Sequence, residues 1–280
     1  MSAPVLTLLY VPADRPERVA KALDSAADVV LVDLEDAVAP ARKDEARANA
    51  VRLLSGPLAR RVQVRINHAS TPWHAADLAT LAGLPVEVGA RIPKVESPAE
   101  IHELAAALPG RDLHPLIESA LGVERALEIA TASPQVASIG LGEADLRSDL
   151  GVTDEAGLAW ARSRVVVAAR AARLVPPVMS AYTNVRDLDG LAASCRAGRA
   201  LGFRGRTAIH PAQLDTIRAA FLPSEQEVSR AREVLSRLDD ATAAGVGAIA
   251  LTDGTFLDVA MLEQARTVLA LAGERPDVTA

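Results

Sequence analysis

Short apolar runs alternate with longer stretches of helical periodicity through most of this chain, and no other feature constrains its fold as strongly. Strands separated by helices form parallel sheets that carry helices on their faces. Eight such units predict an α/β fold, a closed (β/α)₈ TIM barrel, with an open doubly wound sheet as the alternative. The predicted strands are Val5–Val11, Val29–Asp33, Val62–Asn67, Gly89–Val95, Leu113–Glu118, Val136–Gly142, Pro177–Ala181 and Arg206–His210.

The composition agrees with one large domain that has an aliphatic core. The chain has 280 residues, of which half are apolar and only 2% are aromatic. Parallel strands that are buried on both faces favour such sequences. We predict a catalytic barrel over residues 1–222 and a small C-terminal helical extension over residues 223–280, which packs on the barrel or on a neighbouring subunit. The extension should contain a hairpin near Asp253-Gly254 and a final helix from about Val259.

Charge, cysteine content and hydropathy exclude several classes of protein. The net charge is −6 and the charged residues are mixed in sign along the chain, which argues against binding to nucleic acids or membrane surfaces. Cys195 is the only cysteine, so a disulfide framework is excluded and a cytoplasmic location is expected. No apolar run reaches the roughly 18 residues that a membrane span needs.

Polar residues recur where the predicted strands end, which is where barrel enzymes place their active sites. One such residue is most often a solvated loop charge, but seven at the same end of successive strands indicate a functional site. In the third strand, the period-two alternation predicts that Gln63, Arg65 and Asn67 point into the barrel. The residues expected at this end are Glu35, Asp36, Arg65, Lys94, Glu118, Asp145 and His210.

Glu118 and Asp145, which follow neighbouring strands, predict a magnesium site. Two carboxylates supply hard oxygen ligands and leave open positions for water and substrate, as Mg²⁺ prefers. Zinc is disfavoured because the five histidines are scattered and no His and Cys have ligand spacing. A metal at this place could chelate a 2-oxo or 2-hydroxy acid and act as a Lewis acid, while Arg65 grips the same carboxylate.

A rival chemistry would use Lys94 as a Schiff-base nucleophile. It requires a lowered lysine pKa, and Glu96 and the other acids close by argue against that, so Lys94 is predicted to pair with a carboxylate. The sequence contains no G-x-S-x-G or P-loop pattern. Gly140-Leu141-Gly142 lacks the third glycine of a dinucleotide-binding motif.

Seven segments, in order along the chain, resemble the β-subunit of citrate lyase and its relatives, the malyl-CoA and citramalyl-CoA lyases. Together they span most of the predicted barrel. The chain departs from the family pattern at Leu6, at Ala13 and around Ser180–Arg186, which leaves the acyl carrier and the exact substrate open. The matching segments are Tyr10–Arg18, Asp33–Val38, Val64–Asn67, Pro93–Ser97, Pro115–Ala120, Asp145–Gly151 and Ala208–Gln213.

The resemblance implies a barrel that assembles as a trimer or hexamer and assigns roles to several residues. It implies Mg²⁺ on Glu118 and Asp145, with Arg65 binding the acid substrate. Glu35 and Asp36 match acidic residues that line and orient the site. The positions that match coenzyme A contacts are Tyr10, Arg15 and Lys21, although a basic cluster at Arg15, Arg18 and Lys21 is equally typical of a solvated helix start.

The resemblance also extends to the C-terminal segment. Residues 254–258 are similar to a family segment in which an aspartate enters the site of a neighbouring subunit, so Asp258 would be the catalytic acid/base. An aspartate before a helix is otherwise a capping residue, and both interpretations remain open.

These observations predict a magnesium-dependent lyase that cleaves a β-hydroxyacyl-thioester, such as malyl-, citramalyl- or citryl-CoA, into an acyl-CoA and a 2-oxo acid. The acyl-thioester enolate would be protonated by Asp258 or by a water molecule that Glu35 orders. The alternatives are a 2-oxo acid aldolase or a thioester hydrolase on the same barrel, and a non-catalytic subunit. Replacing Arg15 and Lys21 would raise KM only for a CoA substrate.

Overall fold

The computed structural model describes residues 4–243, 249–250, 256–257 and 260–274. The chain divides into two compact units, of which the first is Val5–Arg218 and the second contains the chain from Ala219 onward. Each unit is described by itself. The proposed division of labour, with a catalytic barrel up to residue 222 and an extension that serves a neighbouring subunit, stays a prediction.

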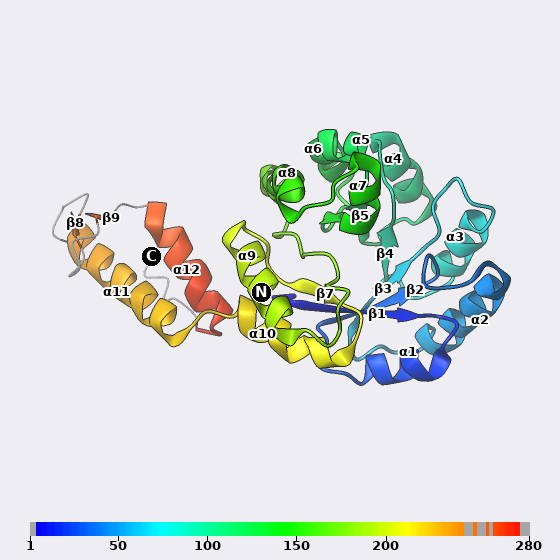
Figure 1. The fold of residues 1–280 in the computed structure, drawn as a ribbon, viewed down its shortest axis with the longest axis horizontal. Helices are drawn as coiled ribbons and strands as arrows, with labels where there is room; N and C mark the ends of the chain where they lie inside the picture. The colour runs from blue at the N-terminus through cyan, green and yellow to red at the C-terminus, as the bar shows by residue number, and fades with distance from the viewer. Residues whose placement is uncertain (1–3, 244–248, 251–255, 258–259, 275–280) are drawn as a thin grey trace. The chain divides into compact units, whose positions relative to one another are not determined.

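The first unit is built on a parallel sheet of seven strands that curls with helices outside it (Figure 1), which confirms the predicted α/β barrel class. The strand order is β6-β5-β4-β3-β2-β1-β7. Every residue of β2 is buried, as expected for a strand covered on both faces. The strands are β1 Thr7–Pro12, β2 Val29–Asp33, β3 Arg61–Arg65, β4 Gly89–Ile92, β5 Leu113–Ile117, β6 Gly140–Leu141 and β7 Arg206–Ala208.

Two predicted strands are reduced to a single bridge or to a two-residue strand. Pro177–Ala181 forms only a single parallel bridge, between Met179 and Arg206. Pro176 and Pro177 have no N–H groups to donate to a ladder, which explains why this segment does not extend its pairing. Of Val136–Gly142, only the last residues pair as a strand, and Val136 makes an isolated bridge to β5.

Helices follow nearly every strand and bury aliphatic faces. In α2, for example, Ala46, Ala50 and Leu54 recur at helical spacing and are fully buried. No described helix is long and apolar enough to cross a membrane. The helices up to α10 are α1 Pro16–Leu23, η1 Pro40–Arg42, α2 Lys43–Leu54, α3 His74–Ala82, α4 Pro98–Ala107, α5 Ala120–Glu124, α6 Ala126–Thr131, α7 Glu143–Leu150, η2 Glu155–Leu158, α8 Ala159–Ala171, α9 Leu188–Ala200, η3 Pro211–Gln213 and α10 Leu214–Phe221.

The second unit is centred on a pair of packed helices, α11 Glu225–Ala243 and α12 Ala260–Leu271. Their shared core consists of Ala231, Val234, Ala265 and Leu269, with further aliphatic side chains around it. Between the helices, β8 Ile249–Ala250 pairs antiparallel with β9 Phe256–Leu257. The predicted hairpin and final helix are thus confirmed, whereas Asp258 lies outside the described residues.

Candidate active site

A cavity of about 860 Å³ lies in the first unit, and five of the predicted site residues line it: Tyr10, Asp36, Arg65, Glu118 and Asp145. They come from β1, the loop after β2, β3, the residue after β5, and α7. The carboxyl ends of neighbouring parallel strands meet at one edge of a sheet, which is why residues so far apart in the sequence share a cavity.

Arg65 is held by a buried carboxylate that sequence reasoning overlooked. Its Nε and Nη2 atoms donate to the two carboxylate oxygens of Asp33 at 2.7 and 2.6 Å. Asp33 is fully buried and also accepts N–H groups from Glu35 and Ala37. The register pairs Asp33 with Arg65 across β2 and β3, and an acid that ends an otherwise apolar strand beside an arginine was the available signal. Arg65 also lies over the ring of Tyr10, 4.9 Å from its centroid.

Glu35 is buried between two cations. Its Oε1 atom lies 2.5 Å from Lys94 Nζ, and its Oε2 atom lies 2.7 Å from Arg65 Nη1, an ion pair without a well-directed hydrogen bond. Burial raises the pKa of Glu35, although the charges of Arg65 and Lys94 oppose the shift. Both oxygens of Glu35 thus face cations, and its predicted role in ordering a water molecule stays a prediction. Asp36 is 62% exposed and lies 3.5 Å from Lys94 Nζ.

Lys94 pairs with carboxylates, as predicted. Burial lowers the pKa of Lys94, but the hydrogen bond to Glu35 and the charges of Glu35 and Glu118 outweigh this and raise it above its ordinary value. An amine held protonated in this way is unsuited to Schiff-base chemistry. Its backbone φ is +54°, an uncommon conformation outside glycine, in which its N–H donates to Glu118 Oε2 at 2.8 Å.

Glu118 is buried against the backbone of Gly142. A Cβ atom on Gly142 would lie 2.0 Å from Glu118 Oε1, so only glycine leaves room for this carboxylate. Burial, followed by the charge of Glu35, raises the pKa of Glu118 to about 7, and Asp145 adds to the rise. The sequence had shown Gly142 only as part of a weak dinucleotide motif.

Glu118 and Asp145 have the donor set of a magnesium site. Asp145 lies in the first turn of α7, is 47% exposed, and has an oxygen 3.8 Å from Lys94 Nζ. Burial is the main cause of the raised pKa of Glu118, the charges of Glu35 and Asp145 add to it, and a divalent cation at this place would favour the ionised carboxylate. No three His, Cys, Asp or Glu side chains in the described ranges form a ready metal cage. Two protein oxygens with room for water and substrate nevertheless fit Mg²⁺.

Two predicted site residues have other roles. His210 is exposed and its Nδ1 atom accepts the N–H of Ala212, so it caps η3 and does not line the cavity. Asn67 does not point into the barrel: its amide donates to Asp77 in α3 and accepts from Lys43 in α2. β3 ends at Arg65, and the strand alternation that predicted the direction of Asn67 no longer applies beyond it.

The residues proposed to contact coenzyme A are not brought together in the cavity. Tyr10 lines it, and burial raises the pKa of Tyr10 to about 12. Arg15 and Lys21, at the start and end of α1, are exposed and do not line it.

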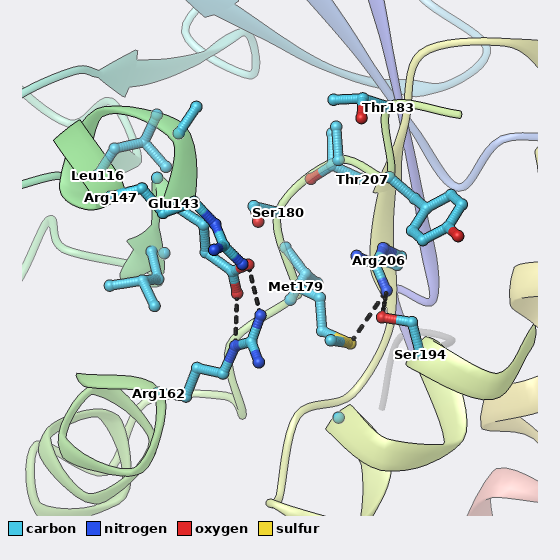
Figure 2. A pocket seen from close by; sticks show the side chains of 18 of the residues that line it. Leu116, Glu143, Arg147, Arg162, Met179, Ser180, Thr183, Ser194, Arg206 and Thr207 are labelled. Carbon is cyan, nitrogen blue, oxygen red and sulfur yellow. Dashed lines mark hydrogen bonds and ion pairs between the residues drawn. The ribbon is translucent and has the colours of Figure 1, made fainter. Parts of the chain in front are cut away.

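Two walls of the cavity that sequence reasoning missed are shown in Figure 2. On one side, Arg162 of α8 donates to both carboxylate oxygens of Glu143 at 2.8 and 2.6 Å and also contacts Glu155. On the other, Arg206 of β7 donates to Ser194 Oγ at 2.8 Å. The partners on each wall lie 7 to 19 residues apart in the sequence without a recurring motif, so no local signal marks them.

Comparison with known proteins is consistent with this geometry. Residues 6–211 match the family model for HpcH/HpaI aldolase/citrate lyase. The chain belongs to this family. It is 35% identical to a (3S)-malyl-CoA thioesterase of Cereibacter sphaeroides, covering 96% of this chain and 95% of that protein. It is 33% identical to an L-malyl-CoA/beta-methylmalyl-CoA lyase of the same species, covering 93% and 92%.

Among solved structures, the chain resembles protein CitE from Mycobacterium tuberculosis in complex with magnesium, acetoacetate and coenzyme A. The TM-score is 0.83 at 37% identity, covering 96% of this chain and 98% of that one. The family and the barrel fold of this chain are therefore established, whereas its reaction is not.

Proposed function

We propose that this family member is a magnesium-dependent carbon–carbon lyase. It would cleave a β-hydroxyacyl-CoA thioester of the malyl, citramalyl or citryl type into an acyl-CoA and a 2-oxo acid. The observation that carries the proposal is the pair Glu118 and Asp145 on the cavity wall, beside the guanidinium of Arg65. Relatives that act on malyl-CoA thioesters, and a similar structure that contains magnesium and coenzyme A, support it.

Glu118 and Asp145 would hold the metal, and Arg65 would bind the carboxylate of the acid. Arg65 has five N–H donors, and its contacts with Asp33 and Glu35 leave some of them for a ligand in the cavity that it lines. When bound, Mg²⁺ would supply a Lewis acid that polarises the oxygen of the 2-oxo acid. Glu35 would act as the residue that positions Arg65 and Lys94.

Cleavage breaks the bond between the α-carbon of the thioester and the carbon that bears the hydroxyl group. The hydroxyl proton would pass to Asp36, an exposed carboxylate of the cavity that Lys94 and Arg65 keep close. The bonding electron pair then moves into the thioester as an enolate. Asp258 would return a proton to the α-carbon, and we propose that it does so from a neighbouring subunit of a homotrimer or homohexamer.

Coenzyme A would lie at the rim of the cavity. Arg15 and Lys21 are exposed cations in α1, which could meet its phosphates, and Tyr10 lies further in, against Arg65. Replacing Arg15 and Lys21 together with alanine should raise KM for a CoA thioester and leave a free-acid substrate unaffected.

A cleavage screen with malyl-, citramalyl- and citryl-CoA, with Mg²⁺ or with EDTA, tests the proposal. We expect EDTA to abolish 2-oxo acid release and Glu118→Gln to lower it at least a hundredfold, because even outer contacts of a metal site contribute roughly 10- to 100-fold. Glu128→Gln, an exposed glutamate in α6, is the control and should retain full activity. Unchanged turnover in EDTA would rule out the metal-dependent mechanism.

The second candidate is a thioester hydrolase, which the similarity to (3S)-malyl-CoA thioesterase favours. The two reactions differ in their products. A lyase releases a 2-oxo acid and retains the thioester, whereas a hydrolase releases the free thiol of coenzyme A. Measuring 2-oxo acid and free thiol in the same sample distinguishes them, and release of thiol without 2-oxo acid would replace the lyase proposal.

A further inference from the structure

Arg91 is a buried arginine of β4, and within the described residues its guanidinium donates hydrogen bonds only to a neutral side chain. It is 3% exposed, and its Nε and Nη2 atoms both donate to the side-chain oxygen of Gln63, at 3.1 and 2.7 Å. Its neighbours in the barrel include His114, whose Nδ1 atom bonds to Ser138 Oγ at 2.8 Å. We call Gln63, Arg91, His114 and Ser138 the interior network.

Of the other cavity arginines, Arg206 of β7 is also buried with neutral partners, whereas Arg65 and Arg162 are matched by acids. Arg65 has Asp33 and Glu35, and Arg162 has Glu143. The carboxylate that acts on Arg91 is Glu118, and it does so only through space, not as an ion pair. Burying a guanidinium without a counter-charge is costly, so an arginine placed this way indicates an anion that is bound when the protein works.

The free side of Arg91 faces the cavity. Arg91 and Gly140 both line it, and no hydrogen bond from Arg91 Nη1 is found within the described residues. A Cβ atom on Gly140 would lie 3.3 Å from Nη1 and 3.0 Å from Leu116, so the glycine leaves space beside this nitrogen. Nη1 is therefore open to a ligand.

Arg65 and Arg91 are partners in the register of β3 and β4, and partners in a parallel pair point to the same face. Adjacent strands lie about 4.8 Å apart, close to the separation of the two carboxylates of a short diacid. We infer that one such molecule fits between the two guanidinium groups, since both line the same cavity.

We propose that Arg91 binds a second carboxylate of the acid substrate and makes this enzyme selective for short 2-oxo dicarboxylic acids over 2-oxo monocarboxylic acids. Among the thioesters named above, this favours the citryl type, because the malyl and citramalyl types release 2-oxo monocarboxylic acids. The inference rests on the proposed function, in which Arg65 holds the first carboxylate. Arg91 is then the residue that determines specificity, and its counter-charge is the substrate itself.

Calorimetric titration in the presence of Mg²⁺ tests this inference with oxaloacetate and 2-oxobutyrate, which have four carbons each and differ in one terminal carboxylate. We expect the wild-type protein to bind oxaloacetate at least tenfold more tightly. Arg91→Met should abolish that preference without weakening 2-oxobutyrate, and Arg91→Lys should retain part of it. Arg61→Met, which removes an exposed positive charge from the start of β3, should keep the full preference.

Two results would overturn the inference: no preference in the wild-type protein, including binding of neither acid, or a preference that survives Arg91→Met. The wild-type comparison does not depend on how any variant folds. The outcome is also separable from the proposed function, because binding is measured without turnover. A clear preference for oxaloacetate without thioester cleavage would refute the proposed lyase activity and support the selectivity role of Arg91. Thioester cleavage without such a preference would support the lyase activity and refute the selectivity role.

Discussion

Two groups of buried polar residues lie close together in the barrel, and they balance their charges differently. In the strand-end cluster of Asp33, Glu35, Arg65, Lys94 and Glu118, each cation forms an ion pair with a carboxylate from a neighbouring element. In the interior network, Arg91 has only Gln63, and His114 has only Ser138.

The two groups differ in whether a buried cation already has a carboxylate partner within the protein. A buried ion pair with good geometry satisfies both partners, and removing either one leaves an uncompensated charge. A buried cation with a neutral partner remains able to attract an anion. Arg65 is therefore held in place by carboxylates and offers only its remaining donors to a ligand, whereas Arg91 has no carboxylate partner among the described residues and can attract a further anion.

We expect the largest effect from a substitution that breaks the strand-end cluster. Asp33→Asn removes the fully buried carboxylate that holds Arg65 and should lower the free energy of unfolding by about 3 to 5 kcal/mol, because the guanidinium stays buried without its main partner. Urea denaturation measures the change. Asp44→Asn, at a side chain that is 95% exposed, should cost less than about 1 kcal/mol. A loss for Asp33→Asn as small as that of the control would contradict this description.

A second change displaces one carboxylate of the cluster without removing charge. Gly142→Ala places a Cβ where Glu118 Oε1 lies, so Glu118 must move and the affinity for Mg²⁺ should fall at least roughly tenfold. Calorimetric titration with MgCl₂ measures it. Gly56→Ala, where a Cβ meets no atom within 4 Å, is the matched control. Equal Mg²⁺ affinities in the two variants would show that Glu118 does not bind the metal.

The interior network should make stability depend on pH. Burial, with the charge of Arg91 adding, lowers the pKa of His114 well below its ordinary value of 6.5. The unfolded chain then binds a proton that the folded chain does not, so this contribution to stability is present above pH 6.5 and is lost as the pH falls below it.

For one proton, the free energy of unfolding changes with pH by a slope that approaches about 1.4 kcal/mol per pH unit. Urea denaturation between pH 7 and pH 5 measures it, with His114→Gln beside the wild type. The wild type should lose more stability than His114→Gln over this range. Parallel pH profiles for the two proteins would show that His114 is not buried in its neutral form.

We expect the smallest effect on stability from a substitution in the interior network. Arg91→Met replaces a buried cation that has no acidic partner with an apolar side chain of similar length, so the free energy of unfolding should stay within about 1 kcal/mol of the wild type or increase. The same urea titrations measure it beside Asp33→Asn. Destabilisation as large as that of Asp33→Asn would assign Arg91 a structural role.

Much of the site followed from strand periodicity. The bounds of β2 were predicted as the structure has them, and the polar residues after β2, β3, β5 and β6 share one cavity. The prediction was wrong for Asn67 and His210 because both lie beyond their strands, where side-chain direction depends on contacts with helices and on turn geometry. Asp33 was missed although an acid at the end of an apolar strand was an available signal, and Arg91 was missed because a single polar residue within a strand gives no pattern.

By itself the sequence determined the family, the order of strands and helices, and the residue types at the strand ends, because these depend on local periodicity and motifs. Only the tertiary structure decided which charges compensate one another. Arg65 and Arg91 are both arginines on neighbouring strands, and nothing local distinguishes them. One meets Asp33 across the sheet and the other meets Gln63, and that difference in buried partners, set by register and packing, separates an arginine whose charge is already paired from one whose charge is not.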